Sequence, residues 1–318
     1  MYQQGIPRAV DADYGAGMDN RSEVRDFLVS RRARLTPREV GLPEVGQRRV
    51  KGLRRGEVAA LAGVSIEYYS KLERGAVAGA SPSVLGAIAR ALHLDDAERS
   101  HLFHLAQAAD DTSGILRPRR RRPKWSPTPQ LQWVLDAITA GPAIVRNGRM
   151  DLLATNALGA AMHASMIDRA SAVAAGRAAN YARYTFLDED SRGFYRDWDV
   201  AADTAVAILR TEAGRDPQDP LIHELVGELS TRSEEFRTRW GRHDVRLHGA
   251  GMKHFHHAAV GDLDLAYESV DMVSEVGLTL TIYAAEPASP TADALALLAS
   301  WWASQVAVDH QESAGRPR

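Results

Sequence analysis

The chain of 318 residues contains no cysteine. This absence excludes a disulfide framework, a cysteine nucleophile and a thiolate metal site, and it is compatible with a reducing compartment. A long apolar run is also missing, because the best candidate, residues 294–308, is interrupted by two serines and a glutamine. The first twenty residues are polar and acidic and predict a disordered tail without a signal peptide. We therefore expect a cytoplasmic protein without a membrane partner.

The sequence also lacks the common catalytic fingerprints. We find no Walker loop, nucleophile elbow, zinc-protease helix or dinucleotide-binding glycine motif. On this basis we expect neither an enzyme nor a bound cofactor.

The small net charge of −2 conceals an asymmetry between the two halves of the chain. Residues 1–125 contain 22 Lys and Arg against 15 Asp and Glu, whereas the remainder contains 17 against 26. A basic front half and an acidic rear half indicate that only the front half meets a polyanion such as nucleic acid.

Composition and periodicity divide the chain into five segments. Residues 1–20 form a tail, 21–110 a helical domain, 111–130 a basic, proline-rich linker, 131–305 a second domain, and 306–318 a polar tail. The arginine run at 119–122 stands between two prolines, which favours an extended linker. It would add nonspecific affinity for DNA, or it is simply a solvated tether.

The first domain carries the geometry of a helix-turn-helix at residues 53–75. Two short helices must cross closely, so Ala59 is small where they touch and Gly63 permits the turn. Val64 fills the angle between the helices, and Ser65 can cap the second one. The amide-rich N-terminus of that second helix would then face the major groove of double-stranded DNA. Further helices are expected at 82–92 and after Asp95, which makes this domain all-α.

The second domain mixes strand and helix periods. Residues 142–147 and 150–155 predict a hairpin around an Asn-Gly turn. Helices are expected at 157–168, 192–213, 218–229, 230–240 and 291–305, and strands at 244–248, 253–258, 263–269 and 278–284. The pattern predicts an α+β domain with helices inserted after the first two strands of an antiparallel sheet.

The Gly-Val-Ser turn at 63–65 and the Leu-Glu-Arg-Gly ending at 72–75 resemble the XRE family of regulators. Over most of its length the chain resembles, more narrowly, the actinobacterial MmyB-like regulators. The stretches that carry the resemblance are residues 53–75, 95–99, 142–143, 156, 180–183, 186–187, 240–245 and 260–261. It implies a lambda-repressor-like DNA-binding domain followed by a PAS-like domain, and a small lipophilic effector, with fatty acids among the candidates.

Position on the second helix predicts which side chains reach DNA. Ile66, Glu67, Tyr68 and Lys71 would face base edges or nearby phosphates, behind the Ser65 cap. Arg74 is a further candidate for a phosphate contact. The family places a phosphate-binding residue where this sequence has Arg55, so the resemblance gives Arg55 that role. A solvated helical face would carry the same residue types, which leaves each single assignment open.

Two further features concern the first domain. The segment between Leu35 and Arg54 is long for this fold, and it contains Arg48 and Arg49. We expect this basic loop to lie along the phosphates or enter a minor groove, although an ordinary solvated loop remains an alternative. The resemblance also pairs Arg32 with Glu73 as an internal brace.

The candidate ligand residues of the second domain are aromatic or able to hold a carboxylate. They are Asn156, Arg183, Phe186, Tyr195, Trp198, Phe236, Trp240 and Lys253. Aromatic residues at helical spacing are more often core residues, so a packing role is the alternative for each. The histidines between 243 and 257 show no ligand spacing, and we expect no metal.

The sequence thus predicts a nucleoid-associated transcriptional regulator. Its front domain binds a double-stranded operator, and its rear domain binds a small effector and forms a homodimer. Two alternatives stay open at this point: a DNA-tethered enzyme that acts on a small molecule, and a regulator whose rear domain binds only a protein partner.

Overall fold

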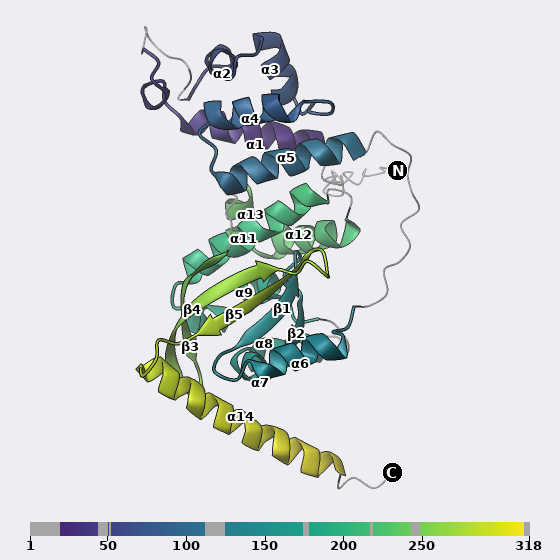
Figure 1. Ribbon diagram of the computed structural model, residues 1–318, viewed down its shortest axis with the longest axis vertical. Coiled ribbons are helices and arrows are strands. Elements are labelled where there is room, and N and C mark those ends of the chain that lie inside the picture. Colours follow the sequence, from purple (N-terminus) through teal and green to yellow (C-terminus); the bar gives the residue numbers. More distant parts are fainter. Residues whose placement is uncertain are drawn as a thin grey trace, which may run out of the picture.

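The computed structural model describes residues 20–43, 50, 52–111, 125–173, 178–216, 219–242 and 249–314. Two domains are stacked along the long axis of the molecule, the N-terminal helices at one end and the C-terminal helix α14 at the other (Figure 1). Within the described residues, no helix combines the length and the apolar character that a membrane span requires.

The N-terminal domain is all-helical, as predicted. Its elements are α1 (Asn20–Arg34), the short 3₁₀ helix η1 (Arg38–Val40), α2 (Arg55–Ala62), α3 (Ile66–Glu73), α4 (Pro82–Ala91) and α5 (Asp96–Asp111). The expected helix starts are present. Ser81 caps α4 ahead of Pro82, and Asp95 and Glu98 form reciprocal side chain to backbone hydrogen bonds of 2.8 and 3.2 Å at the start of α5.

The core of this domain joins residues from all five α-helices. Phe27, Leu28, Tyr69 and Leu102 are among its fully buried side chains. On α2, the apolar side chain of Leu61 does not belong to this core and is 38% exposed. The reason is that α2 packs on its neighbours through the face that carries Val58, Ala59 and Ala62.

The C-terminal domain is built on a five-stranded antiparallel sheet of order β2-β1-β5-β4-β3. The strands are β1 (Ala143–Asn147), β2 (Leu152–Thr155), β3 (Ala250–His257), β4 (Gly261–Asp271) and β5 (Leu278–Ala284). The predicted hairpin is present, and its register pairs Ile144 with Thr155. The strand expected at 244–248 lies outside the described residues.

In sequence order, and among the described residues, one helix of this domain precedes β1, seven helices lie between β2 and β3, and one helix follows β5. They are α6 (Pro129–Ala137), α7 (Ala157–Met162), α8 (Ala164–Val173), α9 (Tyr181–Leu187), α10 (Ser191–Phe194), α11 (Trp198–Arg215), α12 (Pro220–Arg232), α13 (Glu234–Trp240) and α14 (Pro290–Ala314). The α+β class predicted from the sequence is therefore confirmed.

Two helices, α6 and α9, were not expected. Both are short, with nine and seven residues, so their apolar spacing covers too few turns to show a helical period. Local caps define them instead, since the side chains of Thr128 and Asn180 each accept a hydrogen bond from a backbone N–H of the first turn.

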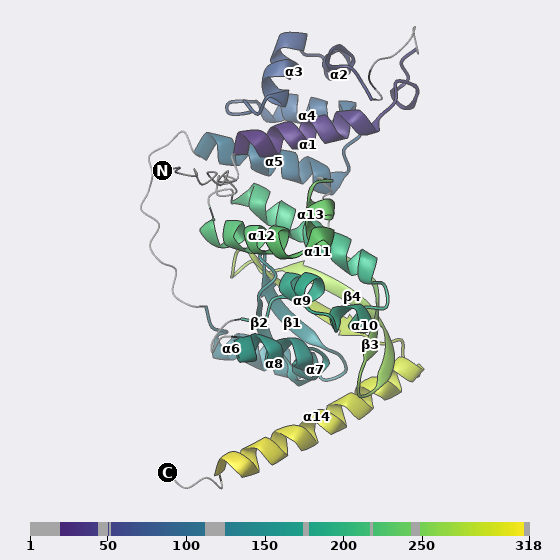
Figure 2. The same ribbon diagram turned by 180° about the vertical axis from the view of Figure 1, so that it is seen from behind.

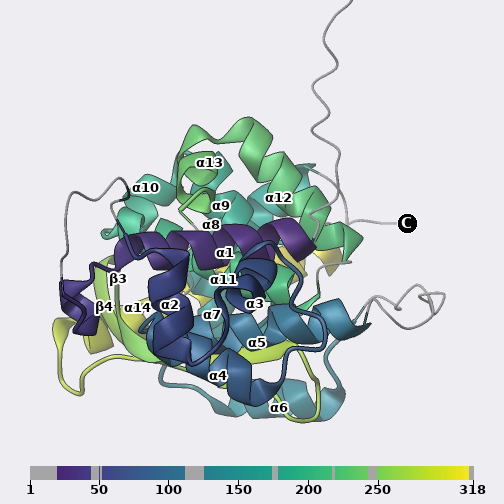
Figure 3. The ribbon, with the colours of Figure 1, turned by 90° about the horizontal axis from the view of Figure 1, so that it is seen from above.

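The two domains meet along α11. This helix lies between the sheet on one side and helices α1 and α5 of the N-terminal domain on the other (Figures 1 and 2). Seen from above, α1 and α5 run across α11, while α2 and α3 form the outermost layer (Figure 3). The helix-turn-helix therefore faces away from the C-terminal domain.

Candidate DNA interface and candidate ligand pocket

The turn between α2 and α3 has the geometry that the sequence predicted. Gly63 ends α2 with a φ of 66°, in the left-handed region that glycine adopts without strain. The Val64 N–H donates to the Ala59 carbonyl at 3.0 Å, and Ala59 is fully buried at the crossing. The Ser65 hydroxyl accepts the Tyr68 N–H at 3.1 Å and so caps α3.

The predicted reading face of α3 is open. Ile66 is 53% exposed, Glu67, Lys71 and Arg74 are exposed as well, and Tyr68 is half-buried. Since Tyr69 and Leu72 are buried on the opposite side, α3 is held by one face and presents the other. Direct contact of these residues with DNA stays a prediction.

A buried carboxylate joins the helices of this domain. Glu73 accepts hydrogen bonds from Arg32 Nε at 2.7 Å and from Arg55 Nε at 2.8 Å, and Arg32 also donates to the Leu53 carbonyl at 2.8 Å. Burial opposes the ionisation of Glu73, but the hydrogen bonds from the two arginines outweigh it and lower its pKa. The expected Arg32–Glu73 brace is thus confirmed.

Arg55 has an internal partner that the sequence did not suggest. Its guanidinium is half exposed while it pairs with Glu73. The same side chain can therefore keep this ion pair and still have N–H groups left for a phosphate, and the phosphate contact stays a prediction. The other basic candidates, Arg48 and Arg49, lie outside the described residues.

A pocket with a mainly apolar wall and a cluster of polar groups lies in the C-terminal domain. Its walls come from the sheet, from α9 and from α11, and the empty space between them, counted out to the open mouth, is about 820 Å³. Ile144, Met150, Ile208 and Phe255 form apolar wall. The polar and ionisable side chains of the lining are Arg146, His163, Tyr181, Thr185, Tyr195, Asp197, Thr204, Lys253, His254, Tyr267, Thr281 and Tyr283.

Two cations share this pocket. Arg146 on β1 is 8% exposed, and Lys253 Nζ on β3 donates to the Tyr283 hydroxyl at 3.2 Å. Burial, aided by the charge of Arg146, lowers the pKa of Lys253 to about 7, and burial also lowers the pKa of Arg146. Among the described residues, no carboxylate forms an ion pair with either side chain. Asp197 also lines the pocket and is exposed, and Asp271 and Glu212 attract Arg146 electrostatically, so the two basic side chains have carboxylates in their surroundings but no ion-pair partner among the described residues.

Three polar groups of the pocket, His163, Tyr181 and Tyr283, are uncharged near neutral pH. Burial lowers the pKa of His163 to about 4, and its Nδ1 donates to the Gly159 carbonyl at 3.0 Å. Burial raises the pKa of both Tyr181 and Tyr283. Within the part of the chain that the structure describes, the buried Tyr181 hydroxyl lacks a hydrogen-bond partner. It is a further group that a ligand can satisfy.

Of the eight predicted ligand residues, Tyr195 and Lys253 line this pocket. Asn156 does not line it, because it caps α7 and its amide donates to the carbonyls of Ile138 and Gly141 at 2.6 and 2.8 Å. Arg183 lies in a separate surface hollow, where it pairs with Glu228 at 2.7 Å. Sequence position alone could not separate these roles.

The remaining four predicted residues lie in an aromatic cluster outside the lining of the pocket. The ring of Phe236 is 5.1 Å from that of Phe186 and is stacked on Trp240 at 5.4 Å. Phe186 also meets Trp198 edge-on at 6.0 Å. These ring contacts agree with the alternative that the four aromatic residues serve packing. A ligand role for them stays an untested prediction.

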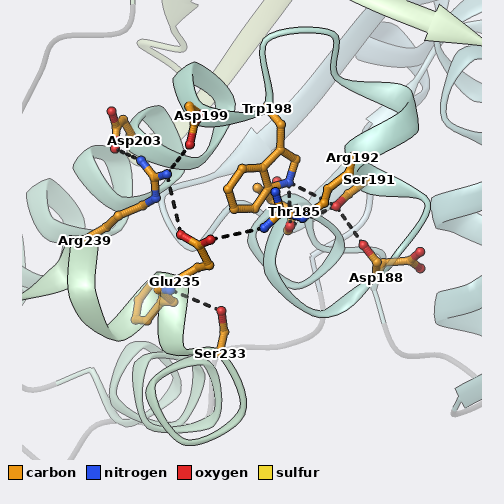
Figure 4. Close-up of polar contacts among 11 residues, drawn as sticks. Thr185, Asp188, Ser191, Arg192, Trp198, Asp199, Asp203, Ser233, Glu235 and Arg239 are labelled. Carbon is orange, nitrogen blue, oxygen red and sulfur yellow. Dashed lines mark hydrogen bonds and ion pairs between the residues drawn. The ribbon is translucent and has the colours of Figure 1, made fainter.

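Figure 4 shows the surroundings of Trp198. Its indole N–H donates to the Thr185 carbonyl at 3.1 Å and to the Ser191 hydroxyl at 3.2 Å. The guanidinium of Arg192 lies 3.9 Å from the centre of a Trp198 ring, and Arg239 bridges Asp199 and Asp203 beside it. These contacts fix α10 and α13 against the start of α11.

The histidines of β3 are occupied by neighbours on β4. His254 and His256 contact Asp264 and Asp262, each at 2.6 Å, and His257 points to the other face of the sheet. In the described ranges, no group of three or more His, Asp or Glu side chains is arranged to hold a metal ion. His243 and His248 lie outside those ranges.

A capped, exposed recognition helix and a separate domain with a partly apolar pocket define a helix-turn-helix regulator with an effector domain. Comparison with protein-family models agrees on both parts. Residues 26–102 match a helix-turn-helix domain, and residues 127–298 match the MmyB-like transcription regulator ligand binding domain. The chain therefore belongs to the MmyB-like transcription regulators, which respond to a ligand. A search of curated proteins found no match for it.

Proposed function

We propose that this regulator binds a small anionic amphiphile, of the fatty-acid class, in the pocket between the sheet and α11. The observation that carries the proposal is that two basic side chains, the buried Arg146 and the partly buried Lys253, lie beside an apolar wall, and neither forms an ion pair with a carboxylate among the described residues. Burying unpaired charge is costly, so an anionic headgroup would relieve the cost while its alkyl chain covers the apolar wall.

The proposal assigns roles to particular atoms. The guanidinium of Arg146 can bind a carboxylate in a bidentate manner, and Lys253 can add a charge-assisted hydrogen bond. Tyr181 and Tyr195 line the same pocket, and their hydroxyls would donate to this headgroup. Ile144, Ile208 and Phe255 supply the apolar contacts.

Isothermal titration calorimetry with dodecanoate tests this site. We expect saturable binding at one site per chain, and a loss of at least tenfold in affinity for Arg146→Met, because one charge-assisted pair is removed. Arg183→Met is the matched control, since Arg183 is a partly buried arginine of the same domain that lies outside the pocket. Equal affinity of the wild type and Arg146→Met would remove the headgroup site.

For the DNA-binding domain we propose that Ile66, Glu67, Tyr68 and Lys71 read an operator, with the Ser65-capped N-terminus of α3 in the major groove. Arg55, Arg74 and the loop with Arg48 and Arg49 would contact phosphates. Support comes from the open face of α3 and from its placement away from the C-terminal domain.

Salt dependence separates the two kinds of contact. Arg48→Ala combined with Arg49→Ala should flatten the slope of log affinity against log salt by about two phosphate contacts. Glu67→Ala should instead change the preferred operator sequence, while the slope of log affinity against log salt stays similar to that of the wild type. An unchanged slope in the arginine variant would exclude the loop from the interface.

We also propose that the regulator is a homodimer that acts on chromosomal DNA without transforming its ligand. Leu297 is 65% exposed and Trp301 is 39% exposed on α14, which leaves the body of the domain at the end opposite the helix-turn-helix. Such a surface favours a second copy as partner.

Dodecanoate recovered unchanged after incubation with the protein would agree with binding without turnover.

A further inference from the structure

Helix α11 has one face in the pocket and the opposite face in the contact between the two domains. Val200, Ala201, Thr204 and Ile208 line the pocket. Arg210 lies two residues after Ile208, which is about 200° around a helix, and so projects to the other side. One rigid element of 18 residues, about 27 Å long, therefore touches both the ligand site and the DNA-binding domain.

The contact on the far side centres on Arg210, which is fully buried. It forms an ion pair with Glu23 of α1, and it donates a second hydrogen bond to the Trp240 carbonyl of α13. Its guanidinium lies 4.1 Å from the centre of a Trp240 ring. Burial lowers the pKa of Arg210, and the charge of Glu23 opposes this effect. This buried arginine of the C-terminal domain thus pairs with a carboxylate of the DNA-binding domain.

The two domains are tightly packed beside Arg210. A methyl group at Gly214, one turn further along α11, would lie 2.5 Å from Cε1 of His101 on α5. His101 is itself fully buried and meets the ring of Phe27 on α1 at 5.0 Å. Because packed interiors shift between discrete arrangements and do not deform smoothly, a movement of α11 must be passed on to α1 and α5.

We propose that Arg210 is a latch between the two domains, through which α11 transmits occupancy of the pocket to the placement of the DNA-binding domain. The role of Arg210 in transmitting pocket occupancy rests on the proposed ligand site. Its role as a latch that holds the two domains together does not. A ligand against Thr204 and Ile208 moves α11, the contact of Arg210 with Glu23 changes, and the orientation of α1, α5 and with them α3 changes as well. In thermodynamic terms, the ligand selects among domain placements that Arg210 distinguishes.

The test measures domain placement directly. The chain has no cysteine, so spin labels can be attached at Arg90→Cys on α4 and Ala137→Cys on α6, both exposed positions. Labelled protein is diluted with unlabelled protein, so that double electron–electron resonance reports the distance within one chain. Glu23→Gln removes the charge that Arg210 pairs with and keeps the shape. Asp96→Asn removes one exposed carboxylate from the same domain as the matched control.

Without any ligand, we expect Glu23→Gln to shift or broaden the distance distribution and Asp96→Asn to leave it as in the wild type. An unchanged distribution in Glu23→Gln overturns the latch. With saturating dodecanoate, we expect the wild-type distribution to shift and the Glu23→Gln distribution not to respond. Calorimetry verifies that dodecanoate is bound to both proteins. If the distance distribution then shifts equally in both proteins, or in neither, transmission through Arg210 is overturned.

If dodecanoate does not bind, the ligand class proposed above fails, and the latch is still decided by the ligand-free comparison. Transmission is then decided by Thr204→Trp, which adds a ring to α11 on the pocket side. We expect it to shift the distribution in the wild-type background and not with Glu23→Gln. A shift of equal size in both backgrounds, or in neither, would overturn the route.

Discussion

Binding of a carboxylate beside Lys253 should take up a proton. In the free protein the pKa of Lys253 is lowered to about 7, chiefly by burial. At pH 8 only about one tenth of the molecules then carry the lysine proton, whereas an anion next to the amine stabilises the charged form. Dodecanoate is ionised throughout this range, so the proton must come from the buffer.

The expected magnitudes follow from that pKa. Proton uptake per bound dodecanoate should be about 0.9 at pH 8, 0.5 at pH 7 and 0.1 at pH 6, if the bound lysine stays protonated. By linkage, the affinity should be nearly constant below pH 6 and should fall up to about tenfold for each pH unit above 7. Arg146 keeps its charge over the whole range and contributes no proton.

Calorimetry in two buffers of different ionisation enthalpy, such as phosphate and Tris, measures the uptake. Lys253→Met should abolish it and flatten the pH profile. His254→Gln is the control, because His254 is another basic residue that lines the pocket. Uptake below about 0.2 proton at pH 8, or uptake that persists in Lys253→Met, would refute the assignment of the anion site to Lys253.

Three further outcomes are expected. Glu73→Ala leaves Arg32 without its buried partner, so urea unfolding of the DNA-binding domain should show a loss of about 3–5 kcal/mol, and full stability would contradict the brace. Without ligand, the wild type should gain stability relative to Lys253→Met as the pH rises from about 7 toward 10, because the unfolded chain then binds the lysine proton that the folded chain has released; a difference that is flat with pH would count against the low pKa. Leu297→Ser should lower the molar mass in light scattering from that of a dimer to that of a monomer, whereas a monomeric wild type would dismiss the proposed homodimer.

The DNA-binding domain was predictable because its signals are local. Gly63 and Ser65 each act within four residues of the chain, through a left-handed turn and a cap. The brace between Arg32 and Glu73 spans 41 positions and rested on family resemblance, not on spacing. Residue identity at neighbouring positions was therefore sufficient for the motif, and homology was needed for its internal support.

The pocket was less predictable, because its polar groups converge from distant parts of the chain. Arg146 was not predicted, although an arginine that directly follows the apolar residues 143–145 of a strand is a signal that could have found it. Tyr181 and Tyr283 belong to α9 and β5, and only the fold brings them to Arg146. Conversely, Phe186 and Phe236 have the aromatic character of ligand residues and lie in a cluster outside the lining of the pocket, where the packing of α9 on α13 places them.

The position of α3 limits how a ligand can act. The recognition helix lies on the side of its domain that faces away from the C-terminal domain, so the ligand domain does not cover it in this arrangement (Figures 1 and 3). A change in domain placement can then alter DNA affinity only by changing the spacing between two recognition helices on two half-sites. The latch and the homodimer consequently make one joint prediction. Dodecanoate should change the affinity for DNA with two half-sites severalfold and leave the affinity for a single half-site unchanged, as measured by fluorescence anisotropy. An equal effect on both DNAs would show that the ligand alters the reading surface itself, which the separation of α3 from the pocket does not explain.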